Sequence, residues 1–135
     1  MMAIIANGGQ DIKPRLVLAL TDSRGNQVRN FISWKGRRVI SRSTANKLAY
    51  LMQAVTSQGT GRSADVTEET AGVKTGTAQS GRFERGREVL NYWIAGFYPL
   101  DRPRAVIVVF ADSLGEGGVN QVFGEITRYL EETIN

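Results

Sequence analysis

The sequence predicts an α/β protein in the broad sense, an α+β fold with a largely antiparallel sheet and a C-terminal helix packed on it. Three candidate strands follow one another at 74–79, 92–98 and 105–111. The connection between the last two is too short for a parallel crossover, so these strands are expected to pair antiparallel. Beyond them, apolar residues recur at helical spacing from Val122 to Ile134, as in a helix that covers a sheet.

Composition narrows the possible chemistry. The chain has 135 residues, of which 41% are apolar and 22% charged, as in one globular domain with a single core. It has no cysteine and no histidine, which excludes disulfides, thiol catalysis, a Ser-His-Asp triad and metal sites built on these residues. We expect neither a metal nor a cofactor. The formal charge of +4 is spread over short basic clusters that we interpret as solvated loops, so no nucleic-acid partner is expected.

The N-terminal third predicts a helix end and a hairpin. Residues 1–9 lack the basic region of a secretion signal and are interpreted as the last turns of a helix that stops at Asn7-Gly8-Gly9. With so little sequence before this stop, we expect the chain to begin in the middle of an element. Segments 14–21 and 27–32 predict two strands joined by a turn.

The middle of the chain predicts a helix followed by a loop. Ser43 is the expected N-cap, and Gly59 is expected to end the helix. Apolar residues spaced by three, four and seven predict one buried stripe, made of Leu48, Leu51, Met52 and Val55. The segment 56–73 is rich in glycine, serine and threonine and therefore predicts a loop.

The strand region predicts a hairpin and a buried strand. The polar, arginine-rich segment 80–88 is interpreted as the long exposed tip of a hairpin between strands 74–79 and 92–98. Segment 105–110 is nearly all apolar, which predicts a central strand covered on both faces. The run 105–111 is too short to cross a bilayer.

Lys74-Thr75-Gly76-Thr77 is the segment that carries candidate chemistry. On one extended stretch it combines a positive charge, two hydroxyls and a glycine that lets another backbone approach closely. A Lys-(Ser/Thr)-Gly triplet is too short to be specific by itself, and a strand edge with an exposed lysine is the simpler interpretation.

Further segments occur in an order and spacing that resemble the end of the transpeptidase domain of penicillin-binding proteins, especially the monofunctional class B kind. They cover nearly the whole chain: Ile5-Ala6-Asn7-Gly8-Gly9, Pro14-Arg15-Leu16-Val17, Arg38-Val39-Ile40-Ser41, Thr44-Ala45, Gly59-Thr60-Gly61, 71–79, 93–99, 106–110, Gly117-Gly118 and Val122-Phe123. Segment 71–79 is close to the family's Lys-Thr-Gly box, with Val73 as an apparent extra residue. The resemblance implies a partial penicillin-binding or serine β-lactamase-like transpeptidase fold, with residues 1–135 as its C-terminal part.

The resemblance also implies roles for the four residues. The family's nucleophile is a serine in a Ser-x-x-Lys motif, assisted by a Ser-x-Asn motif, and its Lys-Thr-Gly strand holds the substrate. Carried over by position, Lys74 is the catalytic residue, which supplies positive charge and organises the proton network. Thr75 and Thr77 would donate hydrogen bonds to the terminal carboxylate of a D-Ala-D-Ala stem peptide or a β-lactam. Gly76 would admit the ligand backbone, and the Thr77 N–H would donate to the oxyanion.

The sequence departs from the family in the nucleophile. It contains neither Ser-x-x-Lys nor Ser-x-Asn, and its one hydroxyl-x-x-lysine, Thr44 with Lys47, is interpreted as ordinary helix chemistry. In the family both motifs lie upstream, so we expect this chain alone to be inactive. Its expected partners are the N-terminal half of the domain, peptidoglycan stem peptides and β-lactams, with homo-oligomers through exposed sheet or core surfaces as a further expectation. The resemblance places the parent protein on a membrane anchor outside these residues, with this domain outside the cytoplasmic membrane.

Two other functions stay open. A non-catalytic module of the same ancestry would bind stem peptide or a protein partner without forming a covalent adduct. A nucleotide- or anion-binding loop at 115–118 would discard the resemblance, but this segment lacks both the P-loop lysine and the three-glycine spacing of a dinucleotide site. We interpret it as a flexible connection from strand to helix.

Overall fold

A computed structural model describes residues 1–32, 36–66, 70–112 and 115–134. The fold is α+β with antiparallel sheets and a C-terminal helix, as predicted. In chain order the elements are α1 (Met2–Ala6), β1 (Ala19–Thr21), β2 (Gln27–Asn30), α2 (Arg42–Gln58), the 3-10 helix η1 (Thr60–Ala64), β3 (Gly72–Glu84), β4 (Arg87–Tyr98), β5 (Ala105–Asp112) and α3 (Gly115–Ile134).

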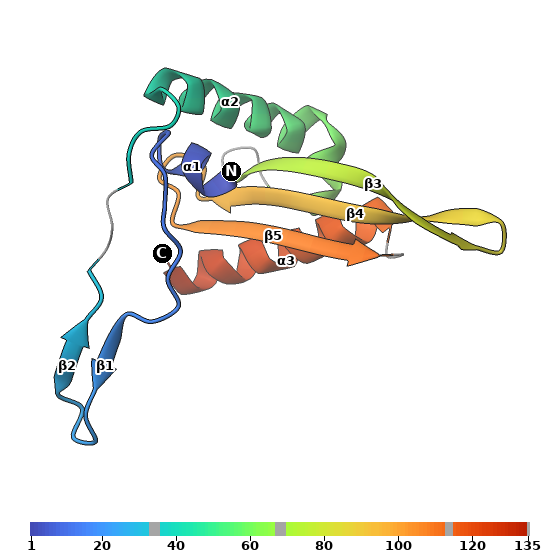
Figure 1. Cartoon of the computed structure of the whole chain (residues 1–135). Coiled ribbons are helices and arrows are strands. Elements are labelled where there is room, and N and C mark those ends of the chain that lie inside the picture. Colours follow the sequence, from blue (N-terminus) through green and yellow to red (C-terminus); the bar gives the residue numbers. More distant parts are fainter. Residues whose placement is uncertain (33–35, 67–69, 113–114, 135) are drawn as a thin grey trace.

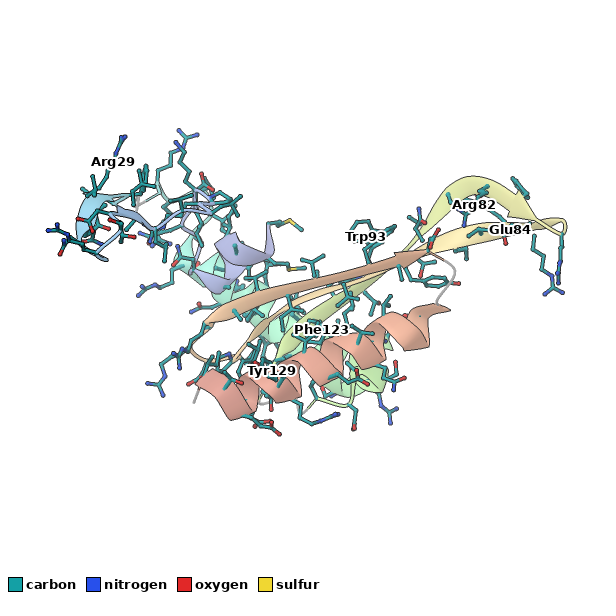
Figure 2. The ribbon with its side chains drawn as sticks, turned by 90° about the horizontal axis from the view of Figure 1, so that it is seen from below. Arg29, Arg82, Glu84, Trp93, Phe123 and Tyr129 are labelled. Carbon is teal, nitrogen blue, oxygen red and sulfur yellow. The ribbon has the colours of Figure 1, made fainter. Side chains whose placement is uncertain are left out.

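The body of the molecule is a three-stranded antiparallel sheet in the order β3-β4-β5, with α3 on one face and α1 and α2 on the other (Figure 1). Side chains alternate across β4, so Ile94 packs with Phe123 of α3, whereas Phe97 packs with Met52 of α2. Figure 2 shows Phe123 between α3 and the sheet, and Trp93 on the opposite side. Two apolar clusters therefore hold the sheet from its two faces.

Helix α2 begins earlier than predicted. Its N-cap is Ser41, whose hydroxyl accepts the N–H of Thr44 at 3.0 Å, so the prediction of Ser43 was wrong by two residues. Its end at Gly59 is as predicted. The predicted apolar stripe is buried at Met52, but Leu51 is 59% exposed because it lies off the face that meets the sheet.

Strand β5 is not central among the described residues. The structure places β4 between β3 and β5, which corrects the prediction for 105–110. Val106, Val108 and Phe110 are about half exposed on the face opposite α3, and the ring of Phe110 lies 4.3 Å from that of Trp93. The apolar run thus has two apolar faces, and in the described part of the chain the α3 face is the better covered one, with Ile107 buried and Val109 half-buried.

The predicted exposed tip at 80–88 is exposed, but most of it is strand. β3 and β4 continue to a tight turn at Arg85 and Gly86, which both have positive φ, and the hairpin reaches past the body as a twisted arm (Figure 1). A register shift between Gln79 and Phe83 bends the arm, and Ser80 donates a hydrogen bond to the Val89 carbonyl there.

The predicted loop at 56–73 is also partly regular, because α2 continues to Gln58, η1 follows, and β3 begins at Gly72. Residues 67–69 lie outside the described part. Segment 115–118, predicted to be a flexible connection, forms the first turn of α3.

The predicted N-terminal hairpin is present, with shorter strands than expected. β1 and β2 pair over Ala19–Thr21 and Gln27–Asn30, and the hairpin projects away from the body (Figure 1). Segment 14–18 has no strand assignment. In the part of the chain that is described, no helix has the length and apolar character needed to cross a membrane.

The carboxylate of Asp22, in the turn of this hairpin, should make the stability of the turn depend on pH. The Asp22 carboxylate accepts hydrogen bonds from the Asn26 side chain at 3.0 Å and from the N–H groups of Asn26 and Arg24 at 2.9 Å, which lowers the pKa of Asp22 below its ordinary value. A lowered folded-state pKa stabilises the turn above the unfolded-state pKa, and this stabilisation is lost as pH falls through the folded-state value. An NMR titration of the Asp22 carboxyl should therefore show a midpoint below that of an Asp in an unstructured peptide. A midpoint at or above the peptide value would contradict these hydrogen bonds.

Candidate functional site

The first half of β3 carries all four predicted site residues. It lies at an edge of the sheet, since β4 pairs with one side and no strand within the described ranges pairs with the other. Along such an edge, every second residue points its N–H and C=O away from the sheet. Lys74, Gly76 and Thr77 are exposed there, whereas Thr75 is only 8% exposed.

The structure divides these residues between the two faces of the sheet. Gly76 pairs with Trp93, and Lys74 therefore shares the face of Trp93. Thr75 pairs with Ile94 of the α3-side core, and Thr77 points to that same side. The four residues come together only along the open edge of β3, where both faces can be reached.

Lys74 places a positive charge at this edge. Its ammonium group donates a hydrogen bond to the carbonyl of Thr75. No carboxylate forms an ion pair with Lys74 in the described part of the chain. An exposed cation next to hydroxyls on a strand edge is suited to bind an anion such as a carboxylate.

The 3-10 helix η1 lies against β3 and adds residues that the sequence did not single out. The hydroxyl of Thr60, at the start of η1, contacts the hydroxyl of Thr75. Gly61 allows this approach, because a Cβ on Gly61 would lie 2.4 Å from a methyl group of Val73. The sequence offered only the triplet Gly59-Thr60-Gly61 as a signal, inside a segment interpreted as loop.

Helix α3 supports η1 through Asn120, which is fully buried. The Asn120 amide donates hydrogen bonds to the carbonyl of Thr60 at 2.9 Å and to the hydroxyl of Ser63 at 2.7 Å. A polar residue between Val119 and Phe123 on the apolar face of α3 is the signal in the sequence that could have indicated this contact. α3 therefore holds η1, and η1 in turn contacts the hydroxyl of Thr75.

Thr44 lies apart from this edge and behaves as predicted. In the first turn of α2 its hydroxyl lies 2.8 Å from the hydroxyl of Ser41, so it belongs to the N-terminal cap of the helix.

Known proteins are similar to this chain over most of its length. The family model for the penicillin binding protein transpeptidase domain matches residues 1–128. Penicillin-binding protein H of Bacillus subtilis is 29% identical, with 96% of this chain and 20% of the relative aligned. The probable peptidoglycan D,D-transpeptidase PenA of Neisseria flavescens is 42% identical over 58% of this chain and 20% of the relative.

Solved structures of penicillin-binding proteins and of a D,D-transpeptidase domain are also similar to this chain. Penicillin-binding protein 3 of Mycobacterium tuberculosis, complexed with aztreonam, is 28% identical with a TM-score of 0.82, covering 98% of this chain and 33% of that one. The D,D-transpeptidase domain of a peptidoglycan glycosyltransferase from Eggerthella lenta is 26% identical with a TM-score of 0.76, covering 98% and 31%. The chain spans about a fifth of the length of these two curated relatives and about a third of the length of these two solved chains.

Proposed function

The chain belongs to the penicillin-binding protein transpeptidase domain family, and from this premise we propose that β3 is the substrate-holding strand of a peptidoglycan D,D-transpeptidase. The observation that carries the proposal is the open edge of β3. There a Lys74 ammonium with no ion-pair partner among the described residues, two threonines and a glycine lie within four consecutive residues. This edge suits a ligand that is anionic at one end and extended along its backbone.

Each residue has a distinct role in this proposal. Lys74 supplies positive charge and organises the proton network around the nucleophile. The hydroxyls of Thr75 and Thr77 donate to the terminal carboxylate of a D-Ala-D-Ala stem peptide or of a β-lactam. Gly76 presents no side chain, so the ligand backbone can lie against the strand, and the Thr77 N–H donates to the oxyanion of the tetrahedral intermediate.

The division between faces restricts how the ligand lies. Lys74 is on the Trp93 face and the threonines are on the α3 face, so a ligand lying flat on one face would reach only one set. A ligand running alongside the edge reaches both sets. We propose that the substrate binds in this edge-on position.

The nucleophile comes from outside these 135 residues, because the sequence has no Ser-x-x-Lys motif. We propose that residues 1–135 act as the C-terminal part of the domain and that the N-terminal part supplies the serine. The complex of the two is called the assembled domain below. The open edge of β5 and the exposed side chains of Trp93, Val108 and Phe110 support this proposal as surfaces for the missing part. The domain is proposed to work outside the cytoplasmic membrane, on a parent protein anchored through another segment.

The alternative is a non-catalytic module that binds stem peptide, and the missing Ser-x-x-Lys motif is the observation that favours it. Pairing of two copies of this chain through the same exposed surfaces is a further alternative to the assembled domain.

One experiment separates these functions. The chain, a matching serine-bearing part and their mixture are each tested for binding of a D-Ala-D-Ala peptide and for a penicillin adduct. If this chain is one half of a transpeptidase domain, we expect a penicillin adduct in the mixture and none on this chain alone. Peptide binding by this chain that is lost in Thr77→Val, with no adduct in any sample, would identify the module instead.

A further inference from the structure

A hydrogen-bonded series connects α3, η1 and β3 next to the proposed substrate edge. Asn120 holds the Thr60 carbonyl at 2.9 Å and the Ser63 hydroxyl at 2.7 Å, and the Thr60 hydroxyl contacts the Thr75 hydroxyl. Asn120 is fully buried and Thr75 is 8% exposed. Thr60 and Ser63 are exposed, so the buried members of this series are Asn120 and Thr75, where a hydrogen bond between protein groups has little competition from water.

The number of hydroxyl protons determines which of the two residues, Thr60 or Thr75, donates the hydrogen bond between them. A threonine hydroxyl has one proton to donate and can accept as well, so in a contact between two hydroxyls only one of them donates. A carboxylate can only accept. If Thr75 is to donate to a ligand carboxylate, its proton is not available to Thr60. Thr60 must then be the donor within the pair.

We propose that Thr60 is a positioning residue, which directs the Thr75 hydroxyl proton toward the ligand carboxylate by donating its own proton to Thr75. Asn120 contributes by fixing the peptide group of Thr60, and so the place from which the Thr60 hydroxyl donates. The inference rests on the proposed function and adds a residue that determines preference for a ligand with a free carboxylate.

Local geometry leaves the two hydroxyls few other arrangements. Threonine is β-branched and has few χ1 rotamers, so each hydroxyl has few directions available. Gly61 brings η1 so close to Val73 that a Cβ there would clash at 2.4 Å, and Asn120 holds the same turn from α3. The Thr60 hydroxyl is thus held against Thr75 from two sides.

The test compares Thr60→Val and Thr60→Ser in the assembled domain, using a penicillin and its methyl ester as probes. Thr60→Val keeps the shape but removes the donor, so the acylation rate constant for penicillin should fall roughly twofold to tenfold, the range for loss of a hydrogen bond between uncharged groups. Thr60→Ser keeps the donor and should restore most of the rate. The ester has no charged carboxylate, so the ratio of the penicillin rate to the ester rate should fall in Thr60→Val.

Thr133→Val is the matched control, because its hydroxyl donates only to the Tyr129 carbonyl within α3 and is exposed. It should leave both rates unchanged. Equal losses for penicillin and ester in Thr60→Val, with a lower melting temperature, would assign Thr60 a structural role and overturn the inference. Unchanged rates in Thr60→Val would also overturn it.

Failure of the inference is distinguishable from failure of the proposed function. If Lys74→Ala and Thr75→Val lower the penicillin rate while Thr60→Val does not, only the inference is wrong. If the wild-type assembled domain does not react with penicillin at all, the proposed function is wrong, and the inference about Thr60, which rests on it, is wrong as well.

Discussion

Replacing Lys74 with alanine should lower the acylation rate constant of the assembled domain by roughly 10²–10⁴-fold, the range for loss of a group that organises proton transfer. Lys74 is exposed, and its ammonium group has no carboxylate partner among the residues described. Removing it should therefore change the melting temperature little. The expected result is a folded protein that reacts slowly, measured as the time course of penicillin adduct formation.

Two variants make this result specific to position 74. Lys47→Ala removes an exposed lysine from α2, away from the β3 edge, and should leave the rate unchanged. Lys74→Arg keeps the charge but has a different shape and does not give up its proton, so it should react at an intermediate rate. A wild-type rate in Lys74→Ala would remove Lys74 from the site.

Replacing Gly124 with alanine should give the largest loss of stability, about 3 kcal/mol or more, because it overpacks a close contact. A Cβ on Gly124 would lie 1.9 Å from the carbonyl oxygen of Ala64, so either α3 or η1 has to move. The helix propensity of alanine offsets only about 1 kcal/mol. Thermal unfolding followed by circular dichroism should show a clearly lower midpoint than in the wild type.

Gly117 is the matched control in the same helix. A Cβ there meets no atom within 4 Å, so Gly117→Ala should be neutral or slightly stabilising. An equal midpoint for Gly124→Ala and wild type would show that η1 does not pack on α3 as described. Since Ala64 and Thr60 belong to the same short helix, Gly124→Ala should also slow acylation in the assembled domain.

The elements that the sequence predicted well have strong local patterns. The helix ending at Gly59, the N-terminal hairpin and strands 92–98 and 105–111 all follow from periodicity or turn residues near them in the chain. The N-cap was misplaced because Ser41 and Ser43 are equally suitable by composition. In the structure, the extended backbone of Ser41, with φ −64° and ψ 153°, and the hydrogen bond that its hydroxyl accepts from the N–H of Thr44 identify Ser41 as the cap.

The wrong predictions of the strand order in the sheet and of a loop in place of η1 have a different physical origin. An apolar run shows that both faces of β5 are apolar, but which strand lies beside it is a tertiary property that the run does not contain. A 3-10 helix of five residues has no useful apolar period, and its glycine, serine and threonine content is that of a loop. Segment 56–73 was therefore interpreted as a loop.

The candidate site was found only in part for the same reason. Lys74-Thr75-Gly76-Thr77 is contiguous and could be found by inspection of the sequence. Its support by Thr60 and Asn120 joins residues 60 positions apart. Such a contact is produced by folding and leaves only two weak signals in the sequence, the triplet Gly59-Thr60-Gly61 and a polar side chain on the apolar face of α3.

The most direct test of the central claim is the intact mass of each polypeptide after incubation with penicillin. The chain is incubated alone and together with the matching serine-bearing part. We expect no adduct on this chain in either sample, and an adduct on the serine-bearing part that forms in the mixture and is lost with Lys74→Ala. An adduct on this chain alone would contradict the account, because it would place an activated nucleophile within these 135 residues.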